Sequence, residues 1–421
     1  MRLGDPITIG SLEVRNRLYR APVLEGAGDG PDAAGIYAEA FEANARAGVG
    51  LIIQGNSCVT EEGRSSAGMT RVDTRDRTLR LKEATDAVHR HGARIFLQIG
   101  HAGIYALEGW HQTYAATRKN PLSAVSRPRI HVRPALTGVP TKVLTTAEIH
   151  DFVDACARSS QWAREAGYDG IQIASSNAKF VHQFLSPYYN RRTDEFGGSV
   201  RSRVRILELL AERIRARAGD DFPLTVKIPM GEDAPPFAPR TTFEEGLELC
   251  RLAQEFGYDA ITPVGLSVFP HASLARGADP SDMLETRSIR SRFETALGGS
   301  KLKMAVLRWG YRRGAKDYPF EPLWNRRFFA AAKEVVSIPV FAVGGIRTRA
   351  ECDSILEDGE ADMVGIGRPF YAQPDLAARL LSGRGEVLCE SSNRCVVAQQ
   401  LGMKSRCYNP DVARKRKELV D

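Results

Sequence analysis

The stretch Ala166-Gly167-Tyr168-Asp169-Gly170-Ile171 marks the point where an amphipathic pattern ends at a glycine and a short apolar run begins. The same succession recurs at Phe256-Gly257-Tyr258-Asp259-Ala260-Ile261. A glycine directly after helical periodicity is typical of a helix C-terminus, and a short apolar run is typical of a buried strand. The repeated succession therefore predicts helix-then-strand units and a parallel sheet covered by helices.

Eight short runs in the chain have the apolar, β-rich composition of buried strands. They cover residues 17–21, 51–54, 94–98, 170–174, 224–228, 260–264, 340–343 and 363–366. Amphipathic segments with a period near 3.6 residues lie between them, at 38–47, 79–91, 146–166, 201–216, 243–256, 325–336 and 349–358. Eight such units predict an α/β fold, a closed (β/α)8 TIM barrel. A doubly wound open sheet is the alternative, but no Gly-x-Gly-x-x-Gly follows the first strand.

Other segments surround the predicted barrel. Residues 7–14 are typical of an N-terminal hairpin, which we expect to plug one end of the barrel. Residues 102–144 are loop-like, and residues 265–324, between the sixth and seventh strands, form a long basic insertion. We interpret this insertion either as a lid over the C-terminal mouth or as a solvated or oligomer-facing segment. The predicted organisation is a barrel over 1–385, which includes the insertion, and a C-terminal extension over 386–421.

The composition is that of an ordinary globular chain of 421 residues, 43% hydrophobic and 26% charged. The formal net charge of +7 mildly favours anionic partners, but aromatic residues are not interleaved with the basic ones as nucleic-acid binding would favour. No apolar stretch is long enough for a membrane helix, and the N-terminus lacks the apolar core of a signal peptide. The odd number of mostly scattered cysteines indicates a reducing compartment. We expect a cytoplasmic protein with a small-molecule substrate and without a nucleic-acid or membrane partner, and we leave a homo-oligomer open.

Glycines follow the last two predicted strands, in Val343-Gly344-Gly345-Ile346-Arg347 and Gly365-Ile366-Gly367-Arg368-Pro369. Backbone N–H groups of these two loops form the usual phosphate site of such barrels, so we expect a phosphate-bearing ligand. Gln98 and Lys227 lie at or near the C-terminal ends of two other strands. An amide and a fixed positive charge suit the pyrimidine edge of a flavin, and an internal polar layer is the alternative.

A family resemblance rests on several stretches that occur in order along the chain. They are Arg15-Asn16-Arg17 with Ala21-Pro22, Gly48-Val49-Gly50-Leu51-Ile52-Ile53, Gln98-Ile99-Gly100-His101-Ala102-Gly103, Gln183-Phe184-Leu185-Ser186-Pro187, Asn190-Arg191-Arg192-Thr193-Asp194-Glu195-Phe196-Gly197-Gly198-Ser199, Val343-Gly344-Gly345-Ile346 and Gly367-Arg368-Pro369. Over nearly the whole chain, this order resembles the Old Yellow Enzyme family of NADH:flavin oxidoreductases. The chain also resembles the barrel domain of 2,4-dienoyl-CoA reductase and trimethylamine dehydrogenase.

The resemblance implies a non-covalent FMN in the barrel mouth. The residues that it assigns to the isoalloxazine are Ala21, Pro22, Val23, Leu24, Asn56, Gln98 and Lys227. Those that it assigns to the phosphate are Gly344, Gly345, Gly367 and Arg368. Lys227 stands where many members have Arg, which keeps the charge but gives up bidentate geometry. Leu24 stands where relatives have a Thr or Cys that tunes the flavin, and its side chain cannot form that hydrogen bond.

The substrate-binding positions depart further from the family pattern. Relatives that reduce alkenes carry a His-x-x-His or His-x-x-Asn pair after the fourth strand and a proton-donating Tyr two residues on. Here these positions read Ala174, Asn177 and Lys179. The resemblance therefore implies Asn177 and Lys179 as the catalytic residues, with Lys179 as proton donor if desolvation lowers its pKa from about 10.4. A solvent-facing Lys179 without a catalytic role is the alternative. Other candidate donors, each with a structural reading beside it, are His182, Tyr188 and Tyr189.

The C-terminal cysteines resemble the four-cysteine segment of the iron–sulfur members of the family. Cys389, Cys395 and Cys407 fit that spacing, but Ser392 occupies the remaining ligand position. A cubane cluster normally takes four thiolates, so we expect no iron–sulfur cluster and no metal site. The electrons would then come from NAD(P)H at the same flavin face or from a separate partner.

The resulting hypothesis is an FMN-dependent oxidoreductase that uses NAD(P)H to reduce an activated C=C bond of an enone or enoate. One alternative is a flavin-dependent dehydrogenase or demethylase of an amine or a saturated carbonyl compound. Another is a flavin-binding sensor without catalysis, which the altered substrate positions suggest.

Overall fold

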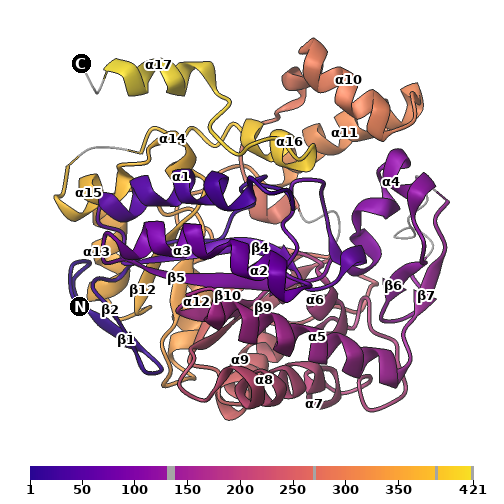
Figure 1. The fold of residues 1–421 in the computed structure, drawn as a ribbon, viewed down its shortest axis with the longest axis horizontal. Helices are drawn as coiled ribbons and strands as arrows, with labels where there is room; N and C mark the ends of the chain where they lie inside the picture. Colours follow the sequence, from indigo (N-terminus) through magenta and orange to yellow (C-terminus); the bar gives the residue numbers. More distant parts are fainter. Residues whose placement is uncertain (130–137, 269–271, 385–386, 419–421) are drawn as a thin grey trace.

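A barrel of parallel strands forms the centre of the computed structural model, which describes residues 1–129, 138–268, 272–384 and 387–418 (Figure 1). Its eight strands have the spatial order β10-β9-β8-β5-β4-β3-β12-β11. A parallel bridge between Ile261 of β10 and Val340, beside β11, joins the two ends of this sheet. The predicted (β/α)8 barrel is therefore confirmed, and the doubly wound open sheet is wrong.

Each predicted strand run is a strand of the barrel. They are β3 (Leu18–Arg20), β4 (Leu51–Cys58), β5 (Arg94–Gly100), β8 (Gly170–Ile173), β9 (Leu224–Asp233), β10 (Ala260–Ser267), β11 (Phe341–Val343) and β12 (Met363–Ile366). Strands β4, β9 and β10 run several residues further than predicted. Their pairing with the neighbouring strand shifts register at Gln54/Ser57 and at Val264/Gly265 and then continues. The added residues therefore extend these strands beyond the barrel mouth.

The helices that cover the barrel also follow the predicted segments. They are α1 (Ala33–Arg46), α2 (Arg75–Arg80), α3 (Lys82–His89), α5 (Thr146–Glu165), α7 (Val200–Arg203), α8 (Arg205–Ala218), α9 (Phe243–Glu255), α12 (Arg326–Lys333) and α13 (Arg349–Glu357). Three of them begin at a capping box, in which a threonine and a glutamate satisfy each other's backbone N–H groups: Thr145 with Glu148, Thr242 with Glu245, and Thr348 with Glu351. Shorter elements are η1 (Glu61–Gly63), α6 (Phe180–Leu185), α14 (Pro369–Ala372) and α15 (Leu376–Leu381).

The N-terminal hairpin closes one end of the barrel, as predicted. Its strands, β1 (Ile7–Ile9) and β2 (Leu12–Val14), pair antiparallel. Ile7, Ile9 and Val14 belong to the same buried cluster as inward-facing residues of the barrel strands, among them Tyr19 and Phe96. The loops that follow the strands therefore gather at the opposite end, on the right of Figure 1.

Three excursions lie around that open end. After β5 come η2 (Gly103–Tyr105), η3 (Leu107–Gly109), α4 (Gln112–Thr117), β6 (Leu122–Ala124) and β7 (Thr141–Val143). The insertion after β10 contains η5 (Ala272–Ala275), η6 (Ser281–Glu285), α10 (Arg287–Ala296) and α11 (Lys301–Asp317), and the extension contains α16 (Arg394–Gln400) and α17 (Pro410–Glu418).

The insertion and the C-terminal extension share one apolar cluster, although the whole of 325–385 lies between them in the chain. Leu284 and Phe293 of the insertion pack in this cluster with Val397 and Leu401 of α16. Figure 1 shows α16 beside α10 and α11 above the barrel. The two segments therefore fold onto each other, which the division at residue 386 did not anticipate.

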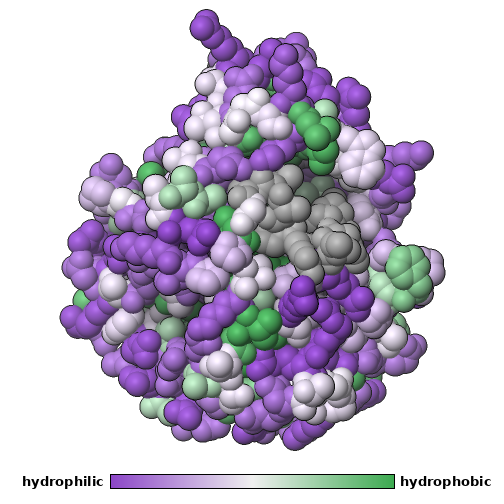
Figure 2. Space-filling model, turned by 90° about the vertical axis from the view of Figure 1, so that its right-hand side faces the viewer, coloured by the Kyte–Doolittle hydropathy of each residue, from purple (hydrophilic) through white to green (hydrophobic). Residues whose placement is uncertain are grey.

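Figure 2 shows the side of the molecule on which the loops of the open barrel end lie, and this side is mainly hydrophilic with only small apolar areas. Among the helices that the structure describes, none combines the length and the apolar character needed to cross a bilayer.

We predict that Gly365→Ala destabilises the barrel. A Cβ at Gly365 would lie 2.1 Å from Cζ of Tyr19, a fully buried side chain whose hydroxyl donates to the Ala342 carbonyl at 3.1 Å. The ring must move, and overpacking of this kind costs about 1–3 kcal/mol of the free energy of unfolding. Urea denaturation measures the change.

The control is Gly35→Ala in α1, where the nearest atom to the added methyl is 3.7 Å away. We expect this helix variant to be as stable as the unmodified chain or slightly more stable. Equal midpoints for the Gly365 variant and the unmodified chain would contradict the packing described for Tyr19.

Candidate functional site

The segment after β3 lies across the open mouth of the barrel. Leu24 forms a parallel bridge to Gly55, and a Cβ at Gly55 would lie 2.8 Å from the Val23 nitrogen. On its other side, Cγ1 of Val23 lies 3.2 Å from the position of a Cβ at Gly367. Glycines on both flanks thus let the backbone of residues 21–24 settle between β4 and β12, beside Asn56. The structure therefore brings together six predicted residues: Ala21, Pro22, Val23, Leu24, Asn56 and Gly367.

A buried ion pair joins the two residues that flank the segment 21–24. Arg20 Nη2 lies 2.7 Å from Glu25 Oε1, and the two side chains are 2% and 1% exposed. The Arg20 guanidinium lies over the ring of Phe41, 4.8 Å from its centroid, and 5.6 Å from that of Tyr371. Burial raises the pKa of the Glu25 carboxyl, and the charge of Arg20 opposes this. The pair therefore anchors both ends of the turn formed by residues 21–24.

The backbone carbonyl of Leu24 accepts hydrogen bonds from three side chains. Tyr371 donates at 2.8 Å, Gln399 Nε2 donates at 3.0 Å, and the Ser405 hydroxyl also donates. The Ser405 N–H donates to the Glu25 carbonyl at 2.9 Å. Gln399 and Ser405 belong to the C-terminal extension, so the extension fixes the segment that crosses the mouth.

A polar layer crosses the barrel just below the mouth. Gln98 Nε2 donates to Gln172 at 2.8 Å, and Gln172 Nε2 donates to the Thr262 hydroxyl at 3.3 Å. Lys227 is the register neighbour of Thr262. Within the described part of the chain, no carboxylate lies within ion-pair distance of Lys227, and burial lowers its pKa to about 8. A buried ammonium without a partner is costly, so this position is suited to a ligand with electron-rich oxygen or nitrogen atoms.

The two glycine loops have a backbone that side chains would obstruct. Gly344 and Gly345 have φ angles of 116° and 81°, and a Cβ at Gly345 would lie 2.6 Å from the Glu321 carbonyl oxygen. Asn325 fixes the loop, since its amide donates to the carbonyls of Val343 at 2.8 Å and Pro263 at 2.9 Å. Asn325 and the adjoining residues thus hold this loop in a backbone conformation that favours glycine.

Three arginines surround these loops. Arg368 donates to the carbonyl of Arg276 at 2.8 Å and to the Asn393 side chain, and Arg347 donates to the Ser391 hydroxyl at 2.5 Å. Burial lowers the pKa of Arg347, and the neighbouring charge of Arg368 adds to this effect. Nη1 of Arg276 pairs with Glu321 at 3.2 Å, whereas its Nε is buried and has no hydrogen-bond partner among the described residues. Such a concentration of positive charge beside glycine loops fits a phosphate group.

The turn after β8 has the left-handed conformation at two consecutive residues. Asn177 and Ala178 have φ angles of 59° and 52°. This conformation costs energy at an alanine, and two side chains hold it: Ala178 N–H donates to His182 Nδ1 at 2.9 Å, and Gln183 Nε2 donates to the Ala178 carbonyl at 2.7 Å. Oδ1 of Asn177 is buried and has no hydrogen-bond partner in the described part of the chain.

His182 is fixed in turn by a buried carboxylate. Because His182 Nδ1 accepts a hydrogen bond, its Nε2 carries the proton toward Glu232 Oε1, 2.6 Å away. Glu232 also accepts from the Ser186 hydroxyl at 2.8 Å and the Thr241 N–H at 2.6 Å. Burial raises the pKa of Glu232, but these hydrogen bonds outweigh it and the net shift is downward. Both nitrogens of His182 are thus engaged within the fold, which assigns it a positioning role.

Lys179 follows this turn and is half-buried. Burial lowers its pKa to about 8, and Cys58 opposes this shift. No ion pair involves Lys179 within the described ranges. Ala174, at the end of β8, lies close to Asn56, because a Cβ at Gly100 would lie 3.0 Å from Ala174 Cβ and 3.2 Å from Asn56 Oδ1. The predicted substrate turn and the predicted ligand-binding residues therefore border the same mouth.

The C-terminal cysteines line a separate pocket beside Arg368, which encloses about 320 Å³ when the solvent at its open side is included. Its lining includes Cys389, Ser392, Cys395 and Cys407, so that three thiols and one hydroxyl face the space. In the part of the chain that the structure describes, no group of His, Cys, Asp or Glu side chains is arranged to hold a metal ion. The donor set lacks the fourth thiolate and does not fit a cubane cluster.

Several contributors to the site were not predicted from the sequence: Arg20, Glu25, Glu232, Arg276, Asn325, Arg347, Tyr371, Asn393, Gln399 and Ser405. Arg20 and Glu25 carried a usable signal, because charges that interrupt an apolar run need partners when buried. Gln399 and Ser405 carried none, because their contacts with Leu24 span 375 and 381 positions in the chain.

Comparisons with known proteins agree with this architecture. The family model described as the NADH:flavin oxidoreductase / NADH oxidase family matches residues 2–281 and 278–386. An N,N-dimethylglycine/sarcosine dehydrogenase from Chromohalobacter salexigens is 28% identical, covering 96% of this chain and 52% of that protein. A cinnamate reductase from Clostridium sporogenes is 26% identical, covering 91% of this chain and 53% of that protein.

Morphinone reductase, a solved structure, superposes with a TM-score of 0.64 at 21% identity and 92% coverage of both chains, which supports the shared fold. The chain spans about half the length of the first curated relatives that it matches. The family model nevertheless covers most of this chain, including both glycine loops and the segment across the mouth. The chain therefore belongs to the NADH:flavin oxidoreductase / NADH oxidase family.

Proposed function

We propose that the chain binds FMN in the barrel mouth and uses NAD(P)H to reduce an activated C=C bond. One observation carries the cofactor assignment: the unpaired Lys227 ammonium and the glycine loops with their arginines lie around one mouth. The backbone of residues 21–23, Asn56, Gln98 and Lys227 would hold the isoalloxazine. Gly344, Gly345, Gly367 and Arg368 would hold the phosphate, with Arg347 as an addition that the sequence did not suggest.

Bound FMN would supply a centre that accepts a hydride from NAD(P)H and passes it on to a substrate. The chain's own residues would orient the substrate and move the proton. Asn177 lies beside the mouth with its Oδ1 buried and unpartnered among the described residues, and its Nδ2 would donate a hydrogen bond to a substrate carbonyl. Lys179 would donate a proton to the carbon next to that carbonyl as the hydride reaches the far carbon. The resulting neutral amine would then regain its proton from solvent.

Amine oxidation is the second candidate. The similarity to an amine dehydrogenase at 28% identity supports it, as does Ala174 in place of a carbonyl-binding histidine. In that reaction, a neutral Lys179 with a pKa of about 8 would act as the base toward the substrate ammonium. We favour alkene reduction because Asn177, the surviving member of the anchor pair, lies in a turn whose next residue, Ala178, is held by the His182–Glu232 pair.

The two half-reactions separate these candidates. Under anaerobic conditions, we expect NADPH or NADH to bleach the flavin absorbance and a cinnamate-type enoate or an enone to restore it. An amine dehydrogenase would instead be bleached by a secondary or tertiary amine and not by the nicotinamide. If the amine bleaches the flavin and the nicotinamide does not, amine oxidation is the activity and the proposed alkene reduction is wrong.

We predict that Gly345→Ala loses bound FMN. The added methyl would lie 2.6 Å from the Glu321 carbonyl and must adopt a φ of 81°, so the loop can no longer hold its N–H groups toward a phosphate. Gly359→Ala is the matched control, because Gly359 has a φ of 70° but no atom within 4 Å of the added Cβ. The flavin-to-protein ratio after purification measures the effect, and equal ratios in the two variants would contradict the phosphate assignment.

We predict a pH dependence that belongs to Lys179. Its pKa is lowered to about 8, and only the ammonium form can donate a proton. The rate of flavin reoxidation by the alkene should therefore be level below pH 8 and fall about tenfold per unit well above it. Lys179→Met should lower this rate by about 100-fold and remove the inflection, whereas flavin reduction by NADPH is retained.

Lys82→Met, which removes the same charge from the outer helix α3, serves as the control and should keep both the rate and the pH profile. If Lys179→Met retains the inflection near pH 8, another group is the proton donor.

A further inference from the structure

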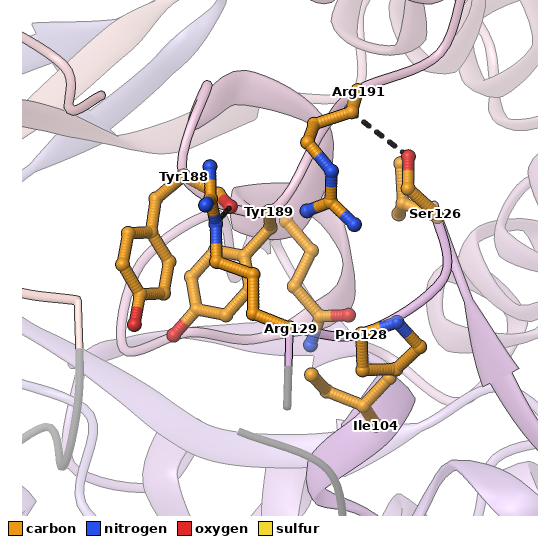
Figure 3. Close-up of a pocket in the computed structure, with 9 residues that line it drawn as sticks. Ile104, Ser126, Pro128, Arg129, Tyr188, Tyr189 and Arg191 are labelled. Atoms are coloured by element: carbon orange, nitrogen blue, oxygen red, sulfur yellow. Dashed lines mark hydrogen bonds between the residues drawn. The ribbon is translucent and has the colours of Figure 1, made fainter. Parts of the chain in front are cut away.

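A second pocket, with an empty volume of about 230 Å³, lies beside the substrate turn (Figure 3). Its lining includes Ile104, Gln183, Tyr188 and Tyr189. Two arginines, Arg129 and Arg191, reach into the same space from different segments of the chain. Arg129 is the last described residue of the segment after β6, and Arg191 lies in the loop after α6. The pocket thus joins the excursion after β5 to the loops after β8.

Among the residues that the structure describes, few hydrogen bonds use these two guanidiniums. Arg129 donates from Nε to the Tyr188 carbonyl at 3.0 Å, and Arg191 donates from Nη2 to the Arg127 carbonyl. A guanidinium has five N–H donors, so several on each side chain stay available. The Ser126 hydroxyl accepts from the Arg191 backbone N–H at 2.9 Å, which leaves its own proton to donate into the pocket.

No carboxylate neutralises these two charges. Within the ranges that the structure describes, neither Arg129 nor Arg191 forms an ion pair with Asp or Glu. The sequence of residues 130–137 contains no acidic residue either. Burial lowers the pKa of Arg191, and the charge of Arg129 adds to this effect, so the two cations lie close enough to repel each other.

Arg192, the next residue in this loop, is an arginine whose guanidinium is bound by other residues of the fold. Arg192 pairs with Asp194 at 2.5 Å and donates to the carbonyls of Val125 at 3.0 Å and Leu144 at 2.7 Å. Its guanidinium is saturated by the fold. Arg191 has no comparable set of partners, so the fold does not account for its position.

The pocket is adjacent to the residues proposed for the chemistry. Gln183, which lines it, donates to the carbonyl of Ala178, the residue between Asn177 and Lys179. Ile104, Tyr188 and Tyr189 share an apolar cluster with Ala178. Arg191 is exposed, so the pocket opens to solvent on its outer side. A ligand whose reactive end lies at Asn177 and Lys179 would therefore place its far end here.

We propose that Arg129, Arg191 and Ser126 form an anion-binding pocket for the carboxylate or phosphate monoester on the far end of the ligand that reacts in the mouth. Two guanidiniums and a hydroxyl match the oxygens of such a group. Two sources carry this chemistry: an alkene substrate with a second carboxylate, and the 2′-phosphate of NADPH. The inference rests on the proposed function for the identity of the ligand, but not for the existence of the pocket.

The test of the ligand uses Arg129→Gln/Arg191→Gln in the FMN-loaded protein. One arm compares the Kd of NADPH with that of NADH, and the other compares the KM of an enoate that carries a second carboxylate with that of its methyl ester. We expect the Kd or KM of one of the two anionic ligands to rise about tenfold or more. The Kd or KM of its counterpart without the anionic group should be unchanged. The affected arm identifies the source. If both anionic ligands bind the variant as well as the unmodified chain, the proposal is overturned.

Arg251→Gln is the control, because it removes the same charge from an exposed position on α9. A second measurement needs neither flavin nor turnover: the rise in Tm that inorganic phosphate produces in the purified chain. We expect a smaller rise in the double variant than in Arg251→Gln. Equal rises in Tm in the two variants would overturn the proposed anion-binding pocket, even if the chain catalyses the flavin reaction. A smaller rise in the double variant, in a chain that shows no flavin reaction, would refute the proposed function and leave the pocket supported.

Discussion

The buried ion pair between Arg20 and Glu25 is the interaction on which the mouth of the barrel depends. It joins the last residue of β3 to the residue after Leu24, so the segment between them has little freedom. Removing one member of a buried pair typically costs about 3–5 kcal/mol, because the other charge stays uncompensated. Nε and Nη1 of Arg20 are already buried without hydrogen-bond partners among the residues described, and the aromatic rings of Phe41 and Tyr371 occupy the space beside the guanidinium. The pair therefore fixes a conformation at some cost in stability.

The C-terminal extension completes the same site from outside the barrel. It donates to the Leu24 carbonyl through Gln399 and Ser405, and it contacts the arginines of the glycine loops through Asn393 and Ser391. One short segment thus supports both ends of the proposed flavin position. This arrangement gives the cysteine-bearing segment a structural role that needs no bound cluster.

Much of the fold could be predicted because its determinants are local. A glycine after most of the amphipathic helices and an apolar run after it indicate the repeated units, and a parallel barrel then places Gln98, Lys227 and the glycine loops at one end. The strands β4, β9 and β10 exceeded their predicted lengths because a register shift leaves no signal in an apolar pattern. The left-handed turn at Asn177 and Ala178 could not be predicted, because its cause is a hydrogen bond to His182, which depends on Glu232 fifty positions away. The roles assigned to Asn177 and Lys179 remain predictions.

The most direct test of this account is the absorbance spectrum of the purified protein, recorded before and after equilibration with FMN and removal of the free flavin. The account predicts the near-ultraviolet and blue bands of an oxidised flavin at about one FMN per chain, released on denaturation because the attachment is non-covalent. A colourless protein that takes up no FMN would contradict it, because the unpaired Lys227 and the arginine-lined glycine loops would then have another ligand.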